Sequence, residues 1–368
     1  MNLDKRIEKL RKDVSSDRLS MSIGELAGLY ERGELDIHPK FQRILRWSDE
    51  QKTKLIESIL LRIPIPPIFV AQDLEGQWDV VDGVQRLGTI FQFLGILKDA
   101  SENLRPALSL SGSELIPELS GLVFDSQDVQ ARTFSGSQRL DFRRSRLDLH
   151  VILKESDPSS KYELFERLNT GGSIASPQEV RNCVLVWINE PLFDWLQGLS
   201  ANTDFTDSVP LSERLEDEEY RTELALRFLV FYAIEEDAMK TMRDVAEFLN
   251  ASNRKMAMDK KYNREREGRV FTDTFQIINR HIGADAFRKR ASDAHSGAFL
   301  ISAFEAVAFG IAFNIDHWRK HPNPATVLKR RVAELWSKRE FTEHIGTGVA
   351  ARPRMQRTIP FGREFFKP

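Results

Sequence analysis

The spacing of apolar residues divides the chain into a mixed first half and a helical second half. Helices are expected where apolar residues recur every three or four positions, and strands where they alternate with polar residues. In the first half this predicts helices over 22–32, 48–60 and 84–97 and strands over 68–71, 78–81 and 147–153. Three helix starts have a serine followed by Glu or Gln three residues later, which is typical of a capping box: Ser22, Ser48 and Ser176.

Beyond about residue 190 the strand signals fade and helical periodicity continues. It predicts helices over 220–234, 242–250, 271–281, 298–317 and 325–338. The most apolar stretch, 298–313, is shorter than the roughly 20 residues that span a bilayer and contains Glu305, so a buried helix is expected there. The last stretch mixes Gly, Arg and Pro, which predicts an irregular tail.

These patterns predict an α+β fold in the first half, followed by an all-helical domain. The expected division is a polar lead-in over 1–19, an α+β domain over 20–189, a helical domain over 190–345 and an irregular tail over 346–368. Residues 100–147, rich in Ser, Leu and Arg, predict irregular structure or a hairpin. A helix over 161–168 should end at the Asn-Thr-Gly-Gly stretch 169–172.

Composition narrows the classes of function. The hydrophobic fraction of 41% and charged fraction of 29% are ordinary for a globular protein and exclude a wholly disordered chain. The lone cysteine, Cys183, excludes an intrachain disulfide and a Cys-rich zinc site. The charged N-terminus predicts no signal peptide, and the chain is expected to be cytoplasmic and away from membranes.

The net charge of −2 gives no overall attraction to nucleic acid, so such contacts must come from local basic patches. Basic residues outnumber acidic ones over 254–269 and over 325–357, and a third cluster lies over 139–146. These runs are compatible with DNA binding and equally with an ordinary solvated face.

The sharpest chemical pattern is an apolar strand that runs into Asp82-Gly83 and directly into a helix. The first N–H groups of a helix have no partner within it, and the helix dipole there favours anions. Arg86 adds a guanidinium suited to phosphate, and Asp82 is placed to hold Mg²⁺ or orient a water. The alternative is a common turn followed by a solvated arginine.

Two further segments share this chemistry. Gln42-Arg43 repeats the pair Gln85-Arg86, and two such pairs at one sheet predict a clamp for a polyanion. Asn169 precedes a Gly-Gly loop that lets backbone approach a ligand closely. The alternatives are a surface loop and a plain helix C-cap.

Together, the segments Ile-x-Pro-x-Phe-Gln-Arg, Val-Asp-Gly-x-Gln-Arg and Phe-Glu-Arg-Leu-Asn-Thr-Gly-Gly resemble, in order and spacing, the N-terminal domain family of GmrSD-type modification-dependent restriction systems. The resemblance covers roughly 20–185. It implies a ParB/sulfiredoxin-like fold and a role in prokaryotic defence against phage or foreign DNA. It also implies binding, and in some members hydrolysis, of a nucleoside triphosphate with Mg²⁺.

Matched to the family motif Asp-Gly-Gln-Gln-Arg, the resemblance implies catalytic roles for Asp82, Gln85 and Arg86, with Asp82 as the metal ligand. The implied nucleotide-binding residues are Gln42, Arg43, Gly83, Arg86 and Asn169. Val84 replaces the first Gln of the motif and removes an amide, which bears on hydrolysis more than on binding.

Three functions are compatible with these residues: an Mg²⁺-dependent NTPase, a non-catalytic sensor that binds DNA or a partner defence protein, and a nuclease acting through the ParB-like site. The HNH nuclease pattern that many relatives have at the C-terminal end was not found among the seven histidines. The expected partners are a nucleotide, DNA, a defence protein or further copies of the chain.

Overall fold

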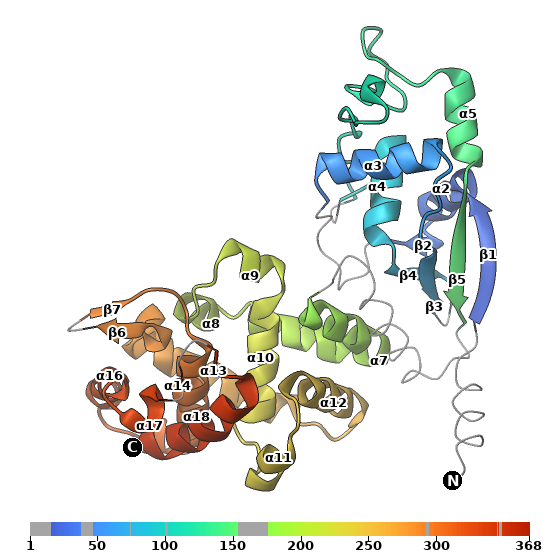
Figure 1. Cartoon of the computed structure of the whole chain (residues 1–368). Coiled ribbons are helices and arrows are strands. Elements are labelled where there is room, and N and C mark those ends of the chain that lie inside the picture. Colours follow the sequence, from blue (N-terminus) through green and yellow to red (C-terminus); the bar gives the residue numbers. More distant parts are fainter. Residues whose placement is uncertain are drawn as a thin grey trace. The chain divides into compact units, whose positions relative to one another are not determined.

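The computed structural model describes residues 16–37, 47–73, 75–99, 102–153, 176–291, 294–343, 345 and 348–368. The chain forms two compact units, Met1–Ile174 and Ala175–Pro368 (Figure 1). The first is α+β and the second is helical apart from one short hairpin, so the predicted fold class is confirmed. No helix in the described part of the chain is long and apolar enough to cross a membrane.

A five-stranded mixed sheet forms the centre of the first unit, in the order β1-β5-β3-β4-β2. β3 and β4, both predicted as strands, form an antiparallel pair, and β5 lies between β1 and β3, antiparallel to β1 and parallel to β3. β2 runs parallel to β4 at the other edge. The bounds are β1 (Ser16–Ser22), β2 (Leu35–Asp36), β3 (Ile68–Gln72), β4 (Trp78–Asp82) and β5 (Arg146–Ile152).

β1 corrects the predicted lead-in over 1–19, because a strand begins at Ser16. Leu19 and Met21 alternate with polar residues and are packed against the core of the first unit. Pairing with β5 places these alternate apolar side chains on the face of the sheet that packs on the core, which favours a strand here.

The described residues of the first unit form the α-helices α2 (Ile23–Glu31), α3 (Asp49–Leu60), α4 (Val84–Leu94) and α5 (Gly136–Arg144). The capping boxes predicted at Ser22 and Ser48 are both present. A further capping box, Ser135 with Gln138, begins α5, a helix that was not predicted from the sequence although the same signal is present. α4 places Leu87, Ile90 and Phe91 in the core with at most 1% exposure.

Over 102–145, within the stretch predicted to be irregular or a hairpin, the structure has irregular chain, the 3₁₀ helix η1 (Pro117–Leu119) and α5. Order there comes from aromatic packing. The ring of Phe93 on α4 makes edge-to-face contacts with three phenylalanines of this stretch, at centroid distances of 5.5, 5.1 and 5.4 Å, namely Phe124, Phe134 and Phe142. Such clusters bury large apolar area without regular secondary structure.

The second unit is built mainly of helices, as predicted. Their bounds are α7 (Pro177–Ser200), α8 (Thr203–Ser208), α9 (Glu213–Asp217), α10 (Tyr220–Phe231), α11 (Glu236–Thr241), α12 (Val245–Met258), α13 (Arg264–His281), η2 (Gly283–Phe287), α14 (Ile301–Phe313), α15 (Ile315–Trp318), α16 (Pro324–Leu335), α17 (Arg339–Thr342) and α18 (Ala351–Phe365). The strands β6 (Lys289–Ala291) and β7 (Ala294–Ser296) form a short hairpin. The predicted helix over 161–168 lies outside the described residues.

The start of α7 belongs to the second unit, so the two units divide near 175 and not near 190. Leu185 is part of the second hydrophobic core. Arg181, 1% exposed, is paired with Glu223 of α10 and donates a hydrogen bond of 3.2 Å to Asn250 Oδ1 of α12. The fading of strand signals after 190 therefore did not mark the division. The backbone of α7 is kinked beside that position, at Asn189 (φ −158°, ψ 77°), but both parts of α7 belong to the second unit.

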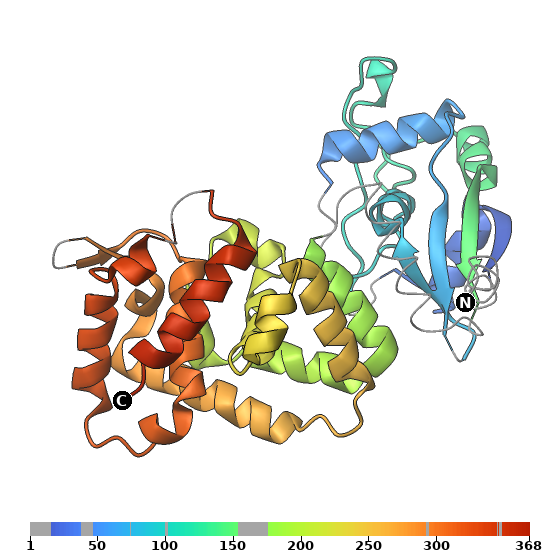
Figure 2. The ribbon, with the colours of Figure 1, turned by 60° about the horizontal axis from the view of Figure 1, so that its bottom comes forward.

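The C-terminal segment corrects the predicted irregular tail, because α18 is helical and packed on α14, which is buried as predicted. Met355 and Ile359 are fully buried, and Arg354 makes two hydrogen bonds, of 2.8 and 3.0 Å, to the buried Glu305 carboxylate. Figure 2 shows α18, in red, lying against the other helices of this unit. Burial against α14 outweighs the weak helix propensity of Gly and Pro.

Candidate functional site

The candidate site lies where β4 ends and α4 begins. Val80 and Val81 are fully buried in β4, and Asp82 ends the strand. Gly83 is the N-cap of α4 with φ 107° and ψ 9°, in the left-handed region that disfavours other residues. The turn from strand to helix is therefore made by one residue.

Gly83 is also required for space. A Cβ atom at this position would lie 2.4 Å from Cδ1 of Ile68 on β3. Glycine therefore lets the start of α4 pack against Ile68 of the sheet without displacing that side chain.

The N-terminus of α4 has the form of an anion site. Among the described residues no side chain caps it, and the first helical bond runs from Leu87 N to Gly83 O at 2.9 Å. The preceding N–H groups, from Val84 to Arg86, have no partner within the helix. Together with the helix dipole they favour a phosphate group at this end.

Arg86 is held on the inner side of this turn, with 11% of its side chain exposed. Its Nη2 lies 2.6 Å from Asp82 Oδ2, and its Nη1 donates to the carbonyl oxygens of Pro66 and of Pro67, the latter at 3.2 Å. Burial lowers the pKa of Arg86, and the Asp82 carboxylate opposes this shift. The alternative of a solvated arginine is therefore wrong, because the Arg86 side chain is largely buried and hydrogen-bonded.

Pro66 and Pro67 were missed as site residues. The sequence indicated that this proline-rich segment is extended, and an extended segment leaves its carbonyl groups without local partners. That signal could have suggested a buried donor such as Arg86 nearby.

Gln85 connects the turn to another part of the chain. Its Oε1 accepts a hydrogen bond of 3.3 Å from Trp47 N, immediately before α3. Trp47 is the first described residue after the segment 38–46, and Asp36, near the start of that segment, pairs with Asp79 of β4. Both ends of the segment are therefore fixed beside β4 and the start of α4.

Gln42, Arg43 and Asn169 lie outside the described residues, so their convergence with Asp82, Gln85 and Arg86 stays a prediction. Val84, which departs from the family motif, is 5% exposed and packs in the core of the first unit. In this chain the side chain at position 84 therefore faces the core.

Asp82 keeps a quarter of its side chain exposed beside the helix N-terminus. In the described part of the chain no three His, Cys, Asp or Glu side chains are grouped as a metal site would need. A single carboxylate suits Mg²⁺ that is held mostly by phosphate and water, so the residues present fit a metal that arrives with its nucleotide.

A family model described as "GmrSD restriction endonuclease, N-terminal domain" matches residues 23–186. The match includes the Asp82–Arg86 turn and ends within α7, so it extends past the first compact unit into the second. The comparisons with curated proteins and with solved structures gave no match. Over residues 23–186 this chain thus resembles the N-terminal domain of the GmrSD restriction endonuclease, as its three motifs predicted.

Proposed function

We propose that this protein is a restriction-type defence component that binds a nucleoside triphosphate at the Asp82–Arg86 turn. The observation that carries the proposal is the N-terminus of α4, which follows β4 through one left-handed glycine and is uncapped by side chains among the described residues. A strand, a glycine turn and a helix start form a recurrent phosphate-binding arrangement.

In this proposal the N–H groups at the start of α4 bind the phosphates and Asp82 faces the metal. Asp82 would help to hold Mg²⁺ brought by the nucleotide, and the ion would supply neutralisation of the phosphate charge. Arg86 holds Asp82 and the Pro66-Pro67 segment in place, because its guanidinium already contacts all three. Arg86 is then a positioning residue, and Gln42, Arg43 and Asn169 are proposed to complete the nucleotide site.

Val84 favours a second candidate, a sensor that binds nucleotide without turnover. The motif glutamine at this position is replaced by a side chain buried in the core, so the amide is lost and nothing polar replaces it there. Binding through backbone N–H groups does not need that amide.

Calorimetric titration of the full chain with ATP, GTP, CTP and UTP in the presence of Mg²⁺ tests the proposal. Saturable binding of at least one nucleotide supports it, and phosphate release with and without DNA then separates the NTPase from the sensor. The absence of binding by all four nucleotides would contradict the site.

Gly83→Ala should weaken nucleotide binding tenfold or more. Alanine at φ 107° is strained by about 1–3 kcal/mol, and its Cβ would lie 2.4 Å from Ile68 Cδ1, so either the Ile68 side chain or the start of α4 must shift. The measurement is the same titration, together with a melting curve.

Gly136→Ala is the matched control, since Gly136 begins α5 in the same unit and a Cβ there meets nothing within 4 Å. This variant should bind nucleotide like the parent. Equal binding by Gly83→Ala and Gly136→Ala would show that the turn does not contact the nucleotide.

A further inference from the structure

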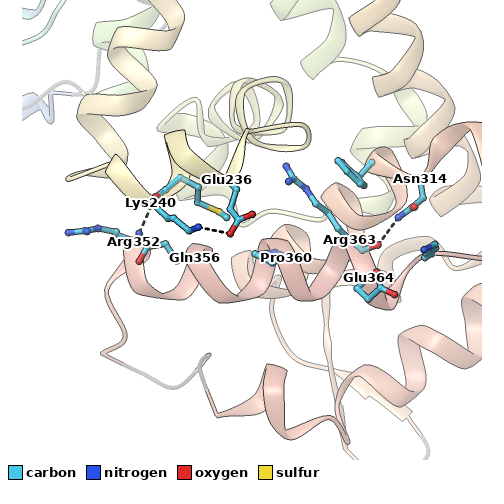
Figure 3. A pocket seen from close by; sticks show the side chains of 11 residues that line it. Glu236, Lys240, Asn314, Arg352, Gln356, Pro360, Arg363 and Glu364 are labelled. Carbon is cyan, nitrogen blue, oxygen red and sulfur yellow. Dashed lines mark hydrogen bonds and ion pairs between the residues drawn. The ribbon is translucent and has the colours of Figure 1, made fainter.

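Two pockets in the second unit adjoin each other at Phe313, the last residue of α14. One, of about 740 Å³, lies between α11 and α18 (Figure 3), and the other, of about 580 Å³, is lined mainly by residues of α13 and α15. Each volume is in the range of small-ligand sites, roughly 300–1,000 Å³. Because both include Phe313, we describe them together as the Phe313 groove.

Positive charge predominates along the Phe313 groove, although the whole chain has a net charge of −2. Seven basic side chains line it against four acidic ones: Lys240, Arg266, Arg269, Arg319, Arg352, Arg363 and Lys367 against Glu236, Glu265, Asp316 and Glu364. The two basic runs that the sequence indicated, 254–269 and 325–357, thus both contribute to one surface. A groove of this sign attracts polyanions.

Phe313 is an apolar side chain that is 52% exposed between these charges. The guanidinium carbon of Arg363 lies 4.5 Å from the centre of its ring. Arg363 Nη2 in turn donates hydrogen bonds to carbonyl oxygens near the end of α10, those of Tyr232 at 3.0 Å and Ile234 at 2.8 Å. The ring is therefore supported on one side by a fixed cation, and its exposed surface can take a second flat group.

The cations beside Phe313 differ in their access to phosphate, because Lys240 is paired with Glu236 and Arg319 with both Asp273 and Asp316. Arg352 and Lys367 are exposed and line the first pocket, and among the described residues neither makes an ion pair with a carboxylate. Arg269 is paired with Glu265 at 2.7 Å, but both side chains are more than 60% exposed, and such pairs contribute little stability. A phosphate group can therefore replace the carboxylate at small cost.

We propose that the Phe313 groove binds single-stranded DNA, with one base stacked on Phe313 and phosphates on the basic residues at either side. Stacking on a protein ring requires a base freed from its duplex neighbours, which favours a single strand. An acidic peptide would match the charge but offers no base to stack. The choice of DNA rests on the restriction-type function proposed above, whereas the site itself is separate from the Asp82–Arg86 turn.

Fluorescence anisotropy of a labelled oligothymidylate of about 12 nucleotides, titrated with the full chain at several salt concentrations, tests this proposal. Phe313→Ala should weaken binding about tenfold or more and leave the salt dependence unchanged, because it removes stacking and no charge. Arg352→Ala and Arg266→Ala should each reduce the slope of log K against log salt by about 0.7, the value for one phosphate contact on a single strand.

Arg330→Ala is the matched control, since Arg330 is 65% exposed on α16 and lines neither pocket. It should keep the affinity and slope of the parent. Circular dichroism of each variant verifies that it is folded. We expect the spectra to match that of the parent, because the substituted side chains are exposed.

The groove proposal is overturned if the parent binds no oligothymidylate at low salt, or if Phe313→Ala binds like the parent. Preference for duplex DNA or polyglutamate also overturns it, and binding of oligouridylate alone overturns the assignment to DNA. Gly83→Ala should bind oligothymidylate like the parent. The two proposals can therefore fail separately: a parent that binds oligothymidylate but no nucleotide contradicts the Asp82–Arg86 site alone, and a parent that binds nucleotide but no oligothymidylate contradicts the groove alone.

Discussion

Arg86→Ala is expected to destabilise the protein by about 3 kcal/mol, since it removes one partner of a largely buried ion pair and leaves two carbonyl groups without a donor. Arg86→Lys should recover only part of this loss, because one ammonium cannot replace a planar guanidinium that contacts Asp82, Pro66 and Pro67 at once. Urea denaturation and thermal melting of the three proteins measure the effect.

Arg139→Ala is the matched control in the same unit. Arg139 is paired with Asp125, but their side chains are 34% and 65% exposed, so the loss should be at most about 1 kcal/mol. If Arg86→Ala and Arg139→Ala lose equally little stability, the Asp82–Arg86 pair does not hold the turn together.

The same variants separate positioning from ligand contact. If Arg86 acts through Asp82, then Arg86→Ala and Asp82→Asn should both reduce Mg²⁺-dependent nucleotide binding, and Arg86→Lys should restore part of it. A direct phosphate contact by Arg86 would instead reduce nucleotide affinity in Arg86→Ala with stability unchanged. Titration and melting on the same preparations distinguish these outcomes.

The second large effect is expected from Gly310→Ala and Gly362→Ala. Each should lower the free energy of unfolding by about 3 kcal/mol or more. A Cβ on Gly310 would lie 2.4 Å from the carbonyl oxygen of Gly362, and a Cβ on Gly362 would lie 2.3 Å from that of Ala306. Both obstacles are backbone atoms of α14 and α18, so the helices must separate to admit a methyl group. Urea denaturation measures the loss.

Gly198→Ala should instead increase the free energy of unfolding. Gly198 is exposed within α7 and a Cβ there meets nothing within 4 Å, so alanine should stabilise the helix by about 0.5–1 kcal/mol. A neutral result for Gly310→Ala and Gly362→Ala would show that α14 and α18 can separate without cost.

At the candidate site, the sequence predicted the strand, the glycine turn and the helix start, and the structure has all three. Each depends on residues adjacent in the chain. The partners of Arg86 were not predictable in the same way, because Pro66 and Pro67 are 20 and 19 residues away, respectively, and are brought near by the β3–β4 pairing. The contact between Gln85 and Trp47 joins residues 38 positions apart and was equally hidden.

By itself the sequence determined where three helices begin, because a capping box is a local bond between residues three positions apart. The predicted starts at Ser22, Ser48 and Ser176 are all confirmed. It also determined the family resemblance, which needs only the order of three motifs. Only the tertiary structure decided that α7 belongs to the second unit, that the Gly- and Pro-containing end is the helix α18, and that Phe313 lies between two basic segments. The physical reason is that burial and the approach of charges depend on contacts between residues far apart in the chain. Local helix propensity depends only on neighbouring residues and does not reflect those contacts.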